Sequence, residues 1–168
     1  DVVGKREAAI VDTWWQTETG GFIGTTLPGL QPMKPGSCGP GALGIYPVIL
    51  DENGNEVEAG RGGNICITNP WPGFMQTIWG DPDRFVETYF ARYNKDPNSK
   101  DWRDWPYMTG DGAVKSKDGY FRIVGRIDDV INVAGHRTSC VDALELEVRV
   151  AMVGTGGVYA VFVGDDLP

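Results

Sequence analysis

Short turn signals divide this chain into hairpins, and they constrain its fold more than any other feature. An Asn-Gly pair stands between the apolar runs 44–50 and 63–68, and an Asp-Gly pair lies inside residues 112–125. Such pairs favour the positive φ angles that tight turns between antiparallel strands require. The sequence therefore predicts two β-hairpins at these places.

A helix is expected over residues 81–93. Asp81 can cap its first turn, and Phe85, Tyr89 and Tyr93 recur every four residues. This spacing places aromatic side chains on one apolar face. Three further strands are expected at 8–11, 129–134 and 158–163, with loops at 27–44 and 94–106, whereas 141–153 fits either a helix or a strand.

Charge and composition exclude several classes of protein. The 168 residues carry a net charge of −8, which argues against a surface for nucleic acid or for an anionic membrane. No apolar run approaches the length of a membrane span. The cysteines, Cys38, Cys66 and Cys140, fit reduced thiols in a cytoplasmic protein better than a disulfide framework. No zinc site is expected, since His136 is the single histidine.

The stretch DTWWQTETGG, residues 12–21, combines two tryptophans with a polar run and paired glycines. An indole can form the flat wall of a small pocket while threonine and glutamine side chains donate hydrogen bonds to phosphate oxygens. Glu18 offers the hard oxygen ligand that Mg²⁺ prefers. The alternative is that Trp14 and Trp15 are core aromatics at a strand end and that the polar run is a turn.

Two later stretches carry charged side chains beside glycines. In YMTGDG, residues 107–112, Asp111 is either a ligand for the two hydroxyls of a ribose or an ordinary turn residue. In GRIDDVINVAGHR, residues 125–137, Arg126 and Arg137 would reach one anionic ligand if the strand between them folds back. The alternative is that both arginines are surface residues paired with neighbouring aspartates.

Taken together and in this order, the three stretches resemble the adenylate-forming enzymes, and within them the acetyl-CoA synthetases. The intervening PMKPGSCG and NPWPGFMQTIWGDPDRF are similar to the same family, and the likeness runs from about Ile10 to Arg137. The resemblance implies an α/β (α+β) fold. Residues 1–127 would be the β-barrel-like C-terminal part of the large adenylation domain. Residues 128–168 would be the start of a small, divergent C-terminal lid domain, with Asp128 as the hinge.

The reaction that the resemblance implies is a two-step ligation. Acetate attacks the α-phosphate of ATP to give acetyl-adenylate, and the thiol of coenzyme A then displaces AMP to give acetyl-CoA. The implied cofactor is Mg²⁺ with ATP, and the implied partners are ATP or AMP, acetate and coenzyme A as co-substrate. Neither a nucleic acid nor a membrane is an expected partner.

The site residues of the family carry over onto matching positions of this chain. Glu18 would meet Mg²⁺, Asp111 the ribose hydroxyls and Arg126 the ribose side of the nucleotide. Trp15 would close the acyl pocket, because an indole at its floor leaves room for a methyl group. The other implied positions are Asp12, Thr13, Trp14, Trp15, Gln16 and Thr17 around adenine and phosphates, Arg137 at the phosphates, and Ala134 and Gly135 at coenzyme A.

The sequence also departs from the family. It holds neither the glycine-, serine- and threonine-rich phosphate loop nor the Gly-Lys pair of the family, and its residues after Arg137 keep only a general likeness. These 168 residues alone are therefore predicted not to catalyse the full reaction, and no complete catalytic set is assigned. Three alternatives stay open: a ligase for propionate or another short acid, a nucleotide-binding remnant, and an interaction module that uses exposed Trp102 and Trp105.

Overall fold

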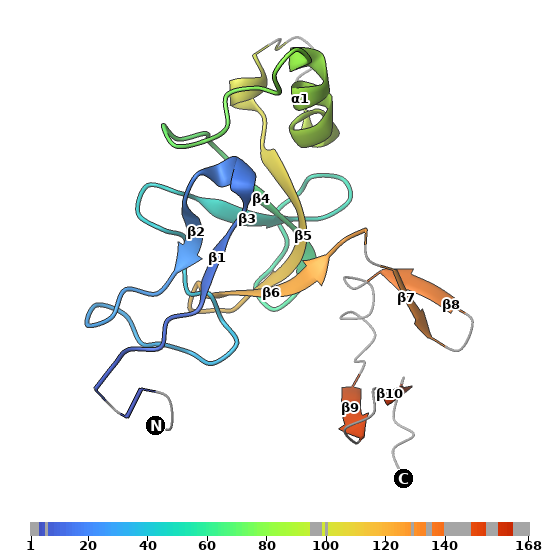
Figure 1. The fold of residues 1–168 in the computed structure, drawn as a ribbon. Helices are drawn as coiled ribbons and strands as arrows, with labels where there is room; N and C mark the ends of the chain where they lie inside the picture. The colour runs from blue at the N-terminus through green and yellow to red at the C-terminus, as the bar shows by residue number, and fades with distance from the viewer. Residues whose placement is uncertain are drawn as a thin grey trace.

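The computed structural model shows a mixed α/β chain in which the strands pair antiparallel (Figure 1). It describes residues 4–5, 7–94, 99, 101–128, 130–133, 136–139, 149–153 and 158–162, with side chains described up to residue 128. Within these ranges the strands form one four-stranded sheet and three two-stranded sheets. The expected combination of helix and strand is confirmed, but none of these sheets closes into a barrel.

A four-stranded sheet in the order β3-β4-β5-β6 forms the centre of the fold. Its strands are β3 (Pro47–Leu50), β4 (Gly62–Ile67), β5 (Tyr107–Lys115) and β6 (Phe121–Arg126). Both predicted hairpins are confirmed, because β3 pairs with β4 and β5 pairs with β6. Gly54 and Gly119 turn these hairpins with φ angles of 75° and 85°, a region that glycine adopts without strain.

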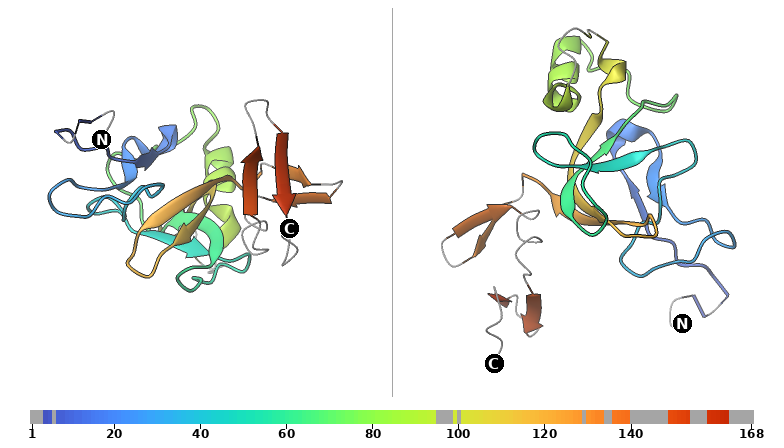
Figure 2. Two further views of the ribbon diagram at one scale, coloured as in Figure 1. Left: turned by 90° about the horizontal axis from the view of Figure 1, so that it is seen from below. Right: turned by 180° about the vertical axis from the view of Figure 1, so that it is seen from behind.

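Helix α1 (Pro82–Tyr89) lies at the end of the sheet where β5 begins (Figures 1 and 2). Its cap is as predicted, since the Asp81 carboxylate accepts a hydrogen bond from the backbone N–H of Arg84 at 3.1 Å. The α-helix ends earlier than expected and is followed by a 3₁₀ turn, η2 (Ala91–Tyr93). The main core cluster joins this helix to the strands through Ile23, Ile67, Phe74, Phe85, Phe90 and Tyr107.

A second hairpin consists of β1 (Thr13–Trp15) and β2 (Phe22–Thr25), joined through the 3₁₀ turn η1 (Thr17–Thr19). Gly20 follows η1 with a φ of 63°, and a Cβ atom there would lie 2.0 Å from the carbonyl oxygen of Gly73. Both the backbone angle and the close approach therefore require glycine. Gly21 meets no such limit, because a Cβ there would have nothing within 4 Å.

Two further strand pairs follow residue 128. β7 (Val130–Val133) pairs with β8 (His136–Ser139), and β9 (Arg149–Val153) pairs with β10 (Val158–Phe162). The strands predicted near 129–134 and 158–163 are thus confirmed, and the end of 141–153 is a strand. The proposed change of domain at residues 127 and 128 stays a prediction.

The strand predicted at 8–11 is wrong. These residues form no strand, and Ile10 is 61% exposed. Residues 8–11 have no partner strand, because the pairing of β1 with β2 begins at Thr13, which lies opposite Thr25. The expected positive φ at Asn53 is also wrong, since Gly54 alone carries it in that turn.

The two tryptophans of the predicted surface loop are not exposed. Trp102 lies on the short 3₁₀ turn η3 (Trp102–Asp104), and both it and Trp105 pack against the main core cluster. The ring centroids of Trp102 lie 5.1 Å from Phe85 and 4.7 Å from Phe90. Both indoles are half-buried against the main core cluster, which removes the observation that favoured an interaction module.

Candidate functional site

The stretches singled out around Trp14 and Asp111 meet in the fold although they lie far apart in the sequence. The indole N–H of Trp14 donates a hydrogen bond to Oδ2 of Asp111 at 3.1 Å. The side-chain amide of Gln16 donates to the same oxygen at 3.0 Å. Asp111 is only 7% exposed, so these two donors replace much of the water that one carboxylate oxygen would otherwise bind. The second oxygen, Oδ1, has Arg126 Nη1 at 3.6 Å.

Arg126 reaches this place across the hairpin, because β5 and β6 pair Asp111 with Arg126. Its Nη1 also donates to the carbonyl oxygen of Thr109 at 3.1 Å, and its Nε donates to Oδ1 of Asp128 at 3.0 Å. The guanidinium lies directly against Gly110, where a Cβ atom would come within 2.8 Å of it. The first glycine of the GDG sequence thus gives room to the arginine as well as a φ of 77° to the strand.

Gln16 is held by a residue that the sequence did not single out. The hydroxyl of Tyr107 donates to Oε1 of Gln16 at 2.7 Å, while Nε2 of Gln16 donates to the carbonyl oxygen of Thr109 at 2.8 Å. Tyr107 belongs to the YMTGDG stretch, in which Asp111 alone had attracted attention. No signal in the sequence pointed to this role, because the hydrogen bond to Gln16 joins residues 91 positions apart.

Glu18 lies on η1 and faces helix α1. Its Oε1 accepts a hydrogen bond from the hydroxyl of Tyr89 at 2.9 Å. Tyr89 was predicted as part of an apolar helix face, and this contact shows that its hydroxyl also forms a hydrogen bond with Glu18. Both residues border a hollow of about 440 Å³, whose other lining residues are Gln16, Thr88, Met108, Thr109, Gly110, Arg126, Ile127 and Asp128.

The electrostatics of the site follow from burial and from Arg126. Desolvation raises the pKa of Asp111, against hydrogen bonds from Trp14 and Gln16 and the charge of Arg126, which lower it. The hydrogen bond from Arg126 lowers the pKa of the exposed Asp128. The site therefore combines a desolvated carboxylate, an arginine and a second carboxylate at Glu18, which is an arrangement suited to a polar ligand that carries both hydroxyls and phosphates.

The two adjacent tryptophans point in different directions, as neighbours on a strand do. Trp14 packs against the core and bonds to Asp111, whereas Trp15 is 56% exposed and packs edge to face on Phe22 at 5.7 Å. The structure therefore does not bring Trp15 together with Asp111.

The remaining predicted residues differ in how far the structure describes them. Asp12 and Thr17 are exposed, and Thr13 is half-buried on β1. Arg137 lies on β8, which pairs antiparallel with β7, but its side chain is outside the described part, so its approach to the ligand of Arg126 stays a prediction. Ala134, Gly135 and Cys140 lie outside the described residues.

Cys38 and Cys66 are buried free thiols, as expected for reduced cysteines. Burial raises the pKa of Cys38 to about 11 and that of Cys66 to about 12. A protonated, buried thiol is a poor nucleophile and a poor metal ligand. Among the residues that the structure describes, no three metal-binding side chains gather into a cluster. No helix of that part has the length and apolar character needed to cross a membrane.

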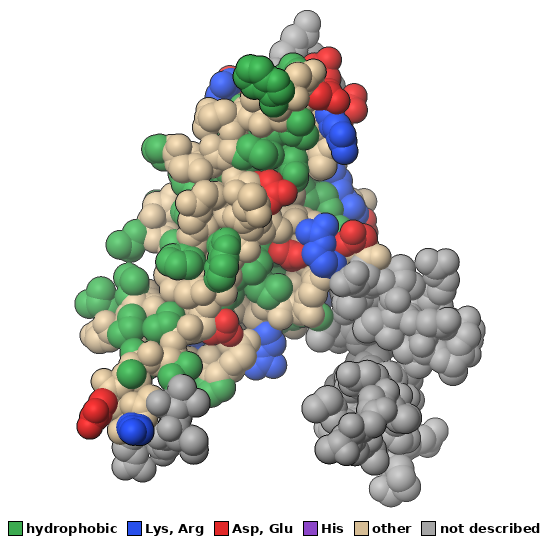
Figure 3. All heavy atoms as spheres, viewed as in Figure 1, with side chains coloured by type: hydrophobic (Ala, Val, Ile, Leu, Met, Phe, Trp, Pro, Cys, Tyr) green, Lys and Arg blue, Asp and Glu red, His purple; other side chains and the backbone are tan. Residues whose placement is uncertain are grey.

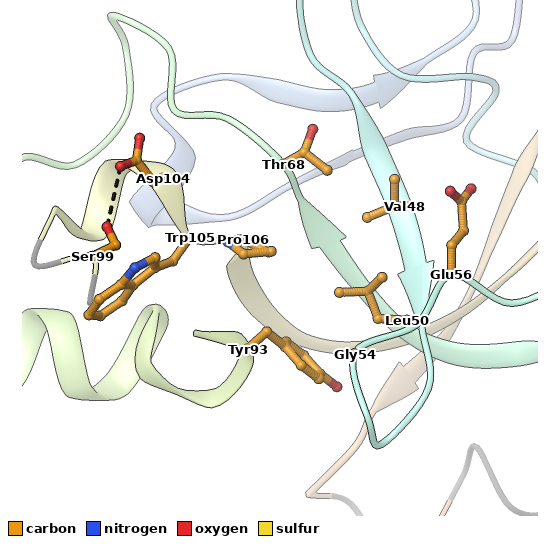
Figure 4. Close-up of a pocket in the computed structure, with 10 residues that line it drawn as sticks. All are labelled: Val48, Leu50, Gly54, Glu56, Thr68, Tyr93, Ser99, Asp104, Trp105 and Pro106. Atoms are coloured by element: carbon orange, nitrogen blue, oxygen red, sulfur yellow. Dashed lines mark hydrogen bonds between the residues drawn. The ribbon is translucent and has the colours of Figure 1, made fainter. Parts of the chain in front are cut away.

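A second hollow, between β3 and the chain segment before β5, contains none of the predicted site residues (Figure 4). Val48 and Leu50 line one side of it, and Trp105 and Tyr93 line another. The buried indole nitrogen of Trp105 has no hydrogen-bond partner among the described residues. This hollow is more apolar than the one beside Glu18 and lies apart from Asp111.

Comparison with known proteins gives consistent matches. Residues 1–79 match the family of AMP-binding enzymes. The chain is 50% identical over 142 residues to an acetyl-coenzyme A synthetase of Rhodopirellula baltica, covering 83% of this chain and 19% of that protein. It is 48% identical over 136 residues to that of Sinorhizobium fredii, covering 81% and 19%, and 45% identical over 151 residues to that of Campylobacter jejuni, covering 90% and 22%.

The chain thus spans about a fifth of the length of the curated relatives it matches. Identity of this extent over most of the chain is not a chance likeness. The fold also brings residues of the separate motifs together at Asp111. This chain is therefore similar to the AMP-binding enzymes over residues 1–79, and over most of its length it is similar to acetyl-coenzyme A synthetases.

Proposed function

We propose that this chain supplies part of the nucleotide site of an acetate–CoA ligase (AMP-forming). Such an enzyme forms acetyl-adenylate from acetate and ATP, and then acetyl-CoA. One observation carries the proposal: Oδ2 of Asp111 is held by two donors, whereas Oδ1 accepts no hydrogen bond from the described residues and faces Arg126. A carboxylate held in this way presents one oxygen to the hydroxyls of a ribose.

The nucleotide would lie along the hollow beside Arg126 and Glu18. Arg126 would contact the ribose side, and the polar run from Asp12 to Thr17 would line adenine and phosphates. Arg137 would bind the phosphates, as the resemblance implies, and it lies on β8 opposite Asn132 of β7. The guanidinium groups would then bind the phosphate oxygens by charge-assisted hydrogen bonds.

Mg²⁺ would enter with ATP rather than occupy a protein cage. Glu18 fits this role, since it is half-buried, borders the hollow and, among the described residues, accepts a hydrogen bond from Tyr89 at Oε1. Mg²⁺ in nucleotide sites takes one or two carboxylates and completes its shell with phosphates and water. The ion would neutralise charge on the phosphates that leave.

We assign three residues after β6 to the second half-reaction, in which coenzyme A reacts. Asp128 would be the hinge of the lid domain, with residues 1–127 in the adenylation domain and 128–168 in the lid. Ala134 and Gly135 would meet coenzyme A. The exposed position of Asp128, directly after the sheet, suits a hinge. A cytoplasmic location would suit this substrate set.

Trp15 would close the acyl pocket from the face of β1 opposite Asp111. An indole there would favour acetate over propionate, although one methylene changes binding by only about 1–3 kcal/mol. A ligase for propionate is therefore the nearest alternative, and a nucleotide-binding remnant is the next.

Calorimetry with AMP tests the nucleotide site on the chain itself. Asp111→Asn should lower the affinity roughly tenfold or more, because an amide cannot accept as strongly as a carboxylate. Asp83→Asn is the matched control, because this aspartate is exposed on the first turn of α1 and does not line the hollow. Equal affinities for the two variants would contradict the proposal.

A chimera tests acetate activation. The 142 aligned residues of this chain replace their counterparts in the Rhodopirellula baltica protein, and acetate-dependent exchange between ATP and pyrophosphate is measured. Exchange by the chimera and none by the 168-residue chain alone is the expected result. A folded chimera that exchanges with propionate but not with acetate would favour the alternative ligase, and one that binds AMP without exchange would favour the remnant.

A further inference from the structure

We propose that Tyr107 is a positioning residue that fixes the carboxylate of Asp111 through the side-chain amide of Gln16. The inference rests on the proposed nucleotide site and adds a residue to it. Tyr107 touches neither Asp111 nor the hollow in any hydrogen bond of the described structure. Its effect would pass through one intermediary, which makes the proposal open to a direct test.

The amide of Gln16 has two ends of opposite character, and the Tyr107 hydroxyl binds the oxygen end while the Thr109 carbonyl binds the nitrogen end. The Tyr107 hydroxyl donates to Oε1 of Gln16 at 2.7 Å, so Nε2 is directed to Oδ2 of Asp111 at 3.0 Å. A rotation of the amide by half a turn would place its oxygen against two acceptors, Oδ2 of Asp111 and the carbonyl oxygen of Thr109, and would deprive the Tyr107 hydroxyl of the acceptor that it now has. The hydrogen bond from Tyr107 therefore acts together with the Thr109 carbonyl to hold Gln16 in the orientation that supports the ionised carboxylate.

The tyrosine is held firmly enough to act as such a reference. Its side chain is 2% exposed. Its ring centroid lies 4.8 Å from that of Phe74, 5.7 Å from Tyr89 and 5.8 Å from Phe90. Burial raises the pKa of Tyr107 above its usual value, so the hydroxyl stays protonated and able to donate near neutral pH. A donor on a rigid aromatic core fixes geometry without reorganisation when a ligand binds.

The support that Gln16 gives matters because Asp111 is desolvated. The donors to its Oδ2 are Trp14 and Gln16, and the charged side chains that influence it are Arg126 and Asp128. Trp14 is fixed by its position on β1 and Arg126 by its contact with Thr109. Gln16 is the member of this group whose donor and acceptor ends can exchange, so a separate residue is needed to hold it.

The test uses Tyr107→Phe, which keeps the ring and removes only the hydroxyl. The matched control is Tyr120→Phe, because Tyr120 is also buried and its hydroxyl donates to the carbonyl oxygen of Pro32 at 2.8 Å. The carboxyl carbon of Asp111 is titrated by NMR in each variant. Tyr107→Phe should raise the pKa of Asp111 by roughly half a unit or more, because a donor to the ionised form becomes disordered. Tyr120→Phe should leave it unchanged.

A double-variant cycle separates positioning from general loss of packing. Gln16→Met removes the amide and should raise the pKa of Asp111 at least as much as Tyr107→Phe does. The double variant should then show the shift of Gln16→Met alone, since Tyr107 acts only through Gln16. Additive shifts, or an Asp111 that titrates alike in Tyr107→Phe and Tyr120→Phe, would overturn the proposal.

Nucleotide binding is measured as an independent arm. Wild type should bind AMP more tightly than 2′,3′-dideoxy-AMP, and Tyr107→Phe should lose most of that preference, whereas Tyr120→Phe should keep it. If wild type shows no preference, the proposed ribose site is wrong, while the titration still decides the role of Tyr107. If wild type shows the preference and Tyr107→Phe retains it in full, the positioning role is wrong.

Discussion

The two faces of the β1–β2 hairpin differ in how many contacts their side chains make within the chain. On the inner face Trp14 packs on the core and bonds to Asp111, and Gln16 bonds to three partners. On the outer face Trp15 and Phe22 are 56% and 53% exposed and pack on each other. Figure 3 shows apolar side chains gathered over the side of the molecule where this hairpin lies.

The difference teaches which part of the site this chain specifies by itself. The inner face is closed by hydrogen bonds between residues of the chain, so its geometry is set by the local fold. The outer face has an indole without comparable contacts, so its geometry would depend on what packs there. We therefore expect changes on the inner face to alter stability and nucleotide binding, and changes on the outer face to leave the stability of the chain nearly unchanged.

The largest effect is expected at the glycine pair Gly20 and Gly21, in the connection between β1 and β2. Gly20→Ala should cost about 3 kcal/mol or more of the free energy of unfolding, because the new Cβ would meet the backbone of Gly73 and φ is positive. Gly21→Ala should change it by less than about 0.5 kcal/mol, since nothing lies near. Urea denaturation of both variants checks this. A similar cost at the two positions would show that the close approach at Gly20 is not a constraint in solution.

The adjacent tryptophans give the next largest contrast. Trp14→Phe should cost about 2 kcal/mol, because it removes the indole donor to a buried carboxylate and part of the packing. Trp15→Phe should cost less than about 0.5 kcal/mol, since most of its ring faces solvent. Thermal unfolding of the paired variants makes the measurement. Equal losses would remove the distinction between an inner and an outer face.

Local patterns in the sequence predicted those parts of the fold that are decided locally. The Asn-Gly and Asp-Gly turns and the cap at Asp81 lie where the pattern placed them, because backbone angles and capping are properties of a few neighbouring residues. The prediction of a strand at 8–11 was wrong because strand pairing depends on a partner elsewhere in the chain. The prediction that Trp105 is exposed was wrong for the same reason, since its partial burial comes from the core cluster and not from its polar neighbours in the sequence.

The candidate site divides in the same way. The motifs identified Trp14, Gln16, Asp111 and Arg126, and the fold brings these together. The sequence did not identify Tyr107, because the hydrogen bond that gives it a role spans 91 positions. A tyrosine in a strand is ordinarily a packing residue, and only the tertiary contact with Gln16 distinguishes it.

A smaller effect is expected at the glycine that gives room to Arg126. Gly110→Ala and Gly119→Ala both introduce a side chain at positive φ, but only the first would displace a guanidinium. Gly110→Ala should therefore cost about 1 kcal/mol more than Gly119→Ala, through the lost bond from Arg126 to Thr109. It should also weaken AMP binding, which Gly119→Ala should not. Denaturation and calorimetry on the pair decide this, and equal behaviour would mean that Arg126 adapts freely.

The smallest effect concerns the pH dependence of the inner face. Desolvation raises the pKa of Asp111 above the ordinary value of 3.8, so between these two values the folded chain binds more protons than the unfolded chain. The contribution of Asp111 to the free energy of unfolding should therefore fall as pH rises from the unfolded-state pKa to the folded-state pKa, and it should level off above the folded-state pKa. Asp111→Asn cannot titrate and should lack this fall. The difference in unfolding free energy between wild type and variant, measured by denaturation from about pH 4 to pH 7, should thus shift in favour of the variant as pH rises. A shift in favour of wild type would mean that Trp14, Gln16 and Arg126 together stabilise the ionised carboxylate more than burial penalises it.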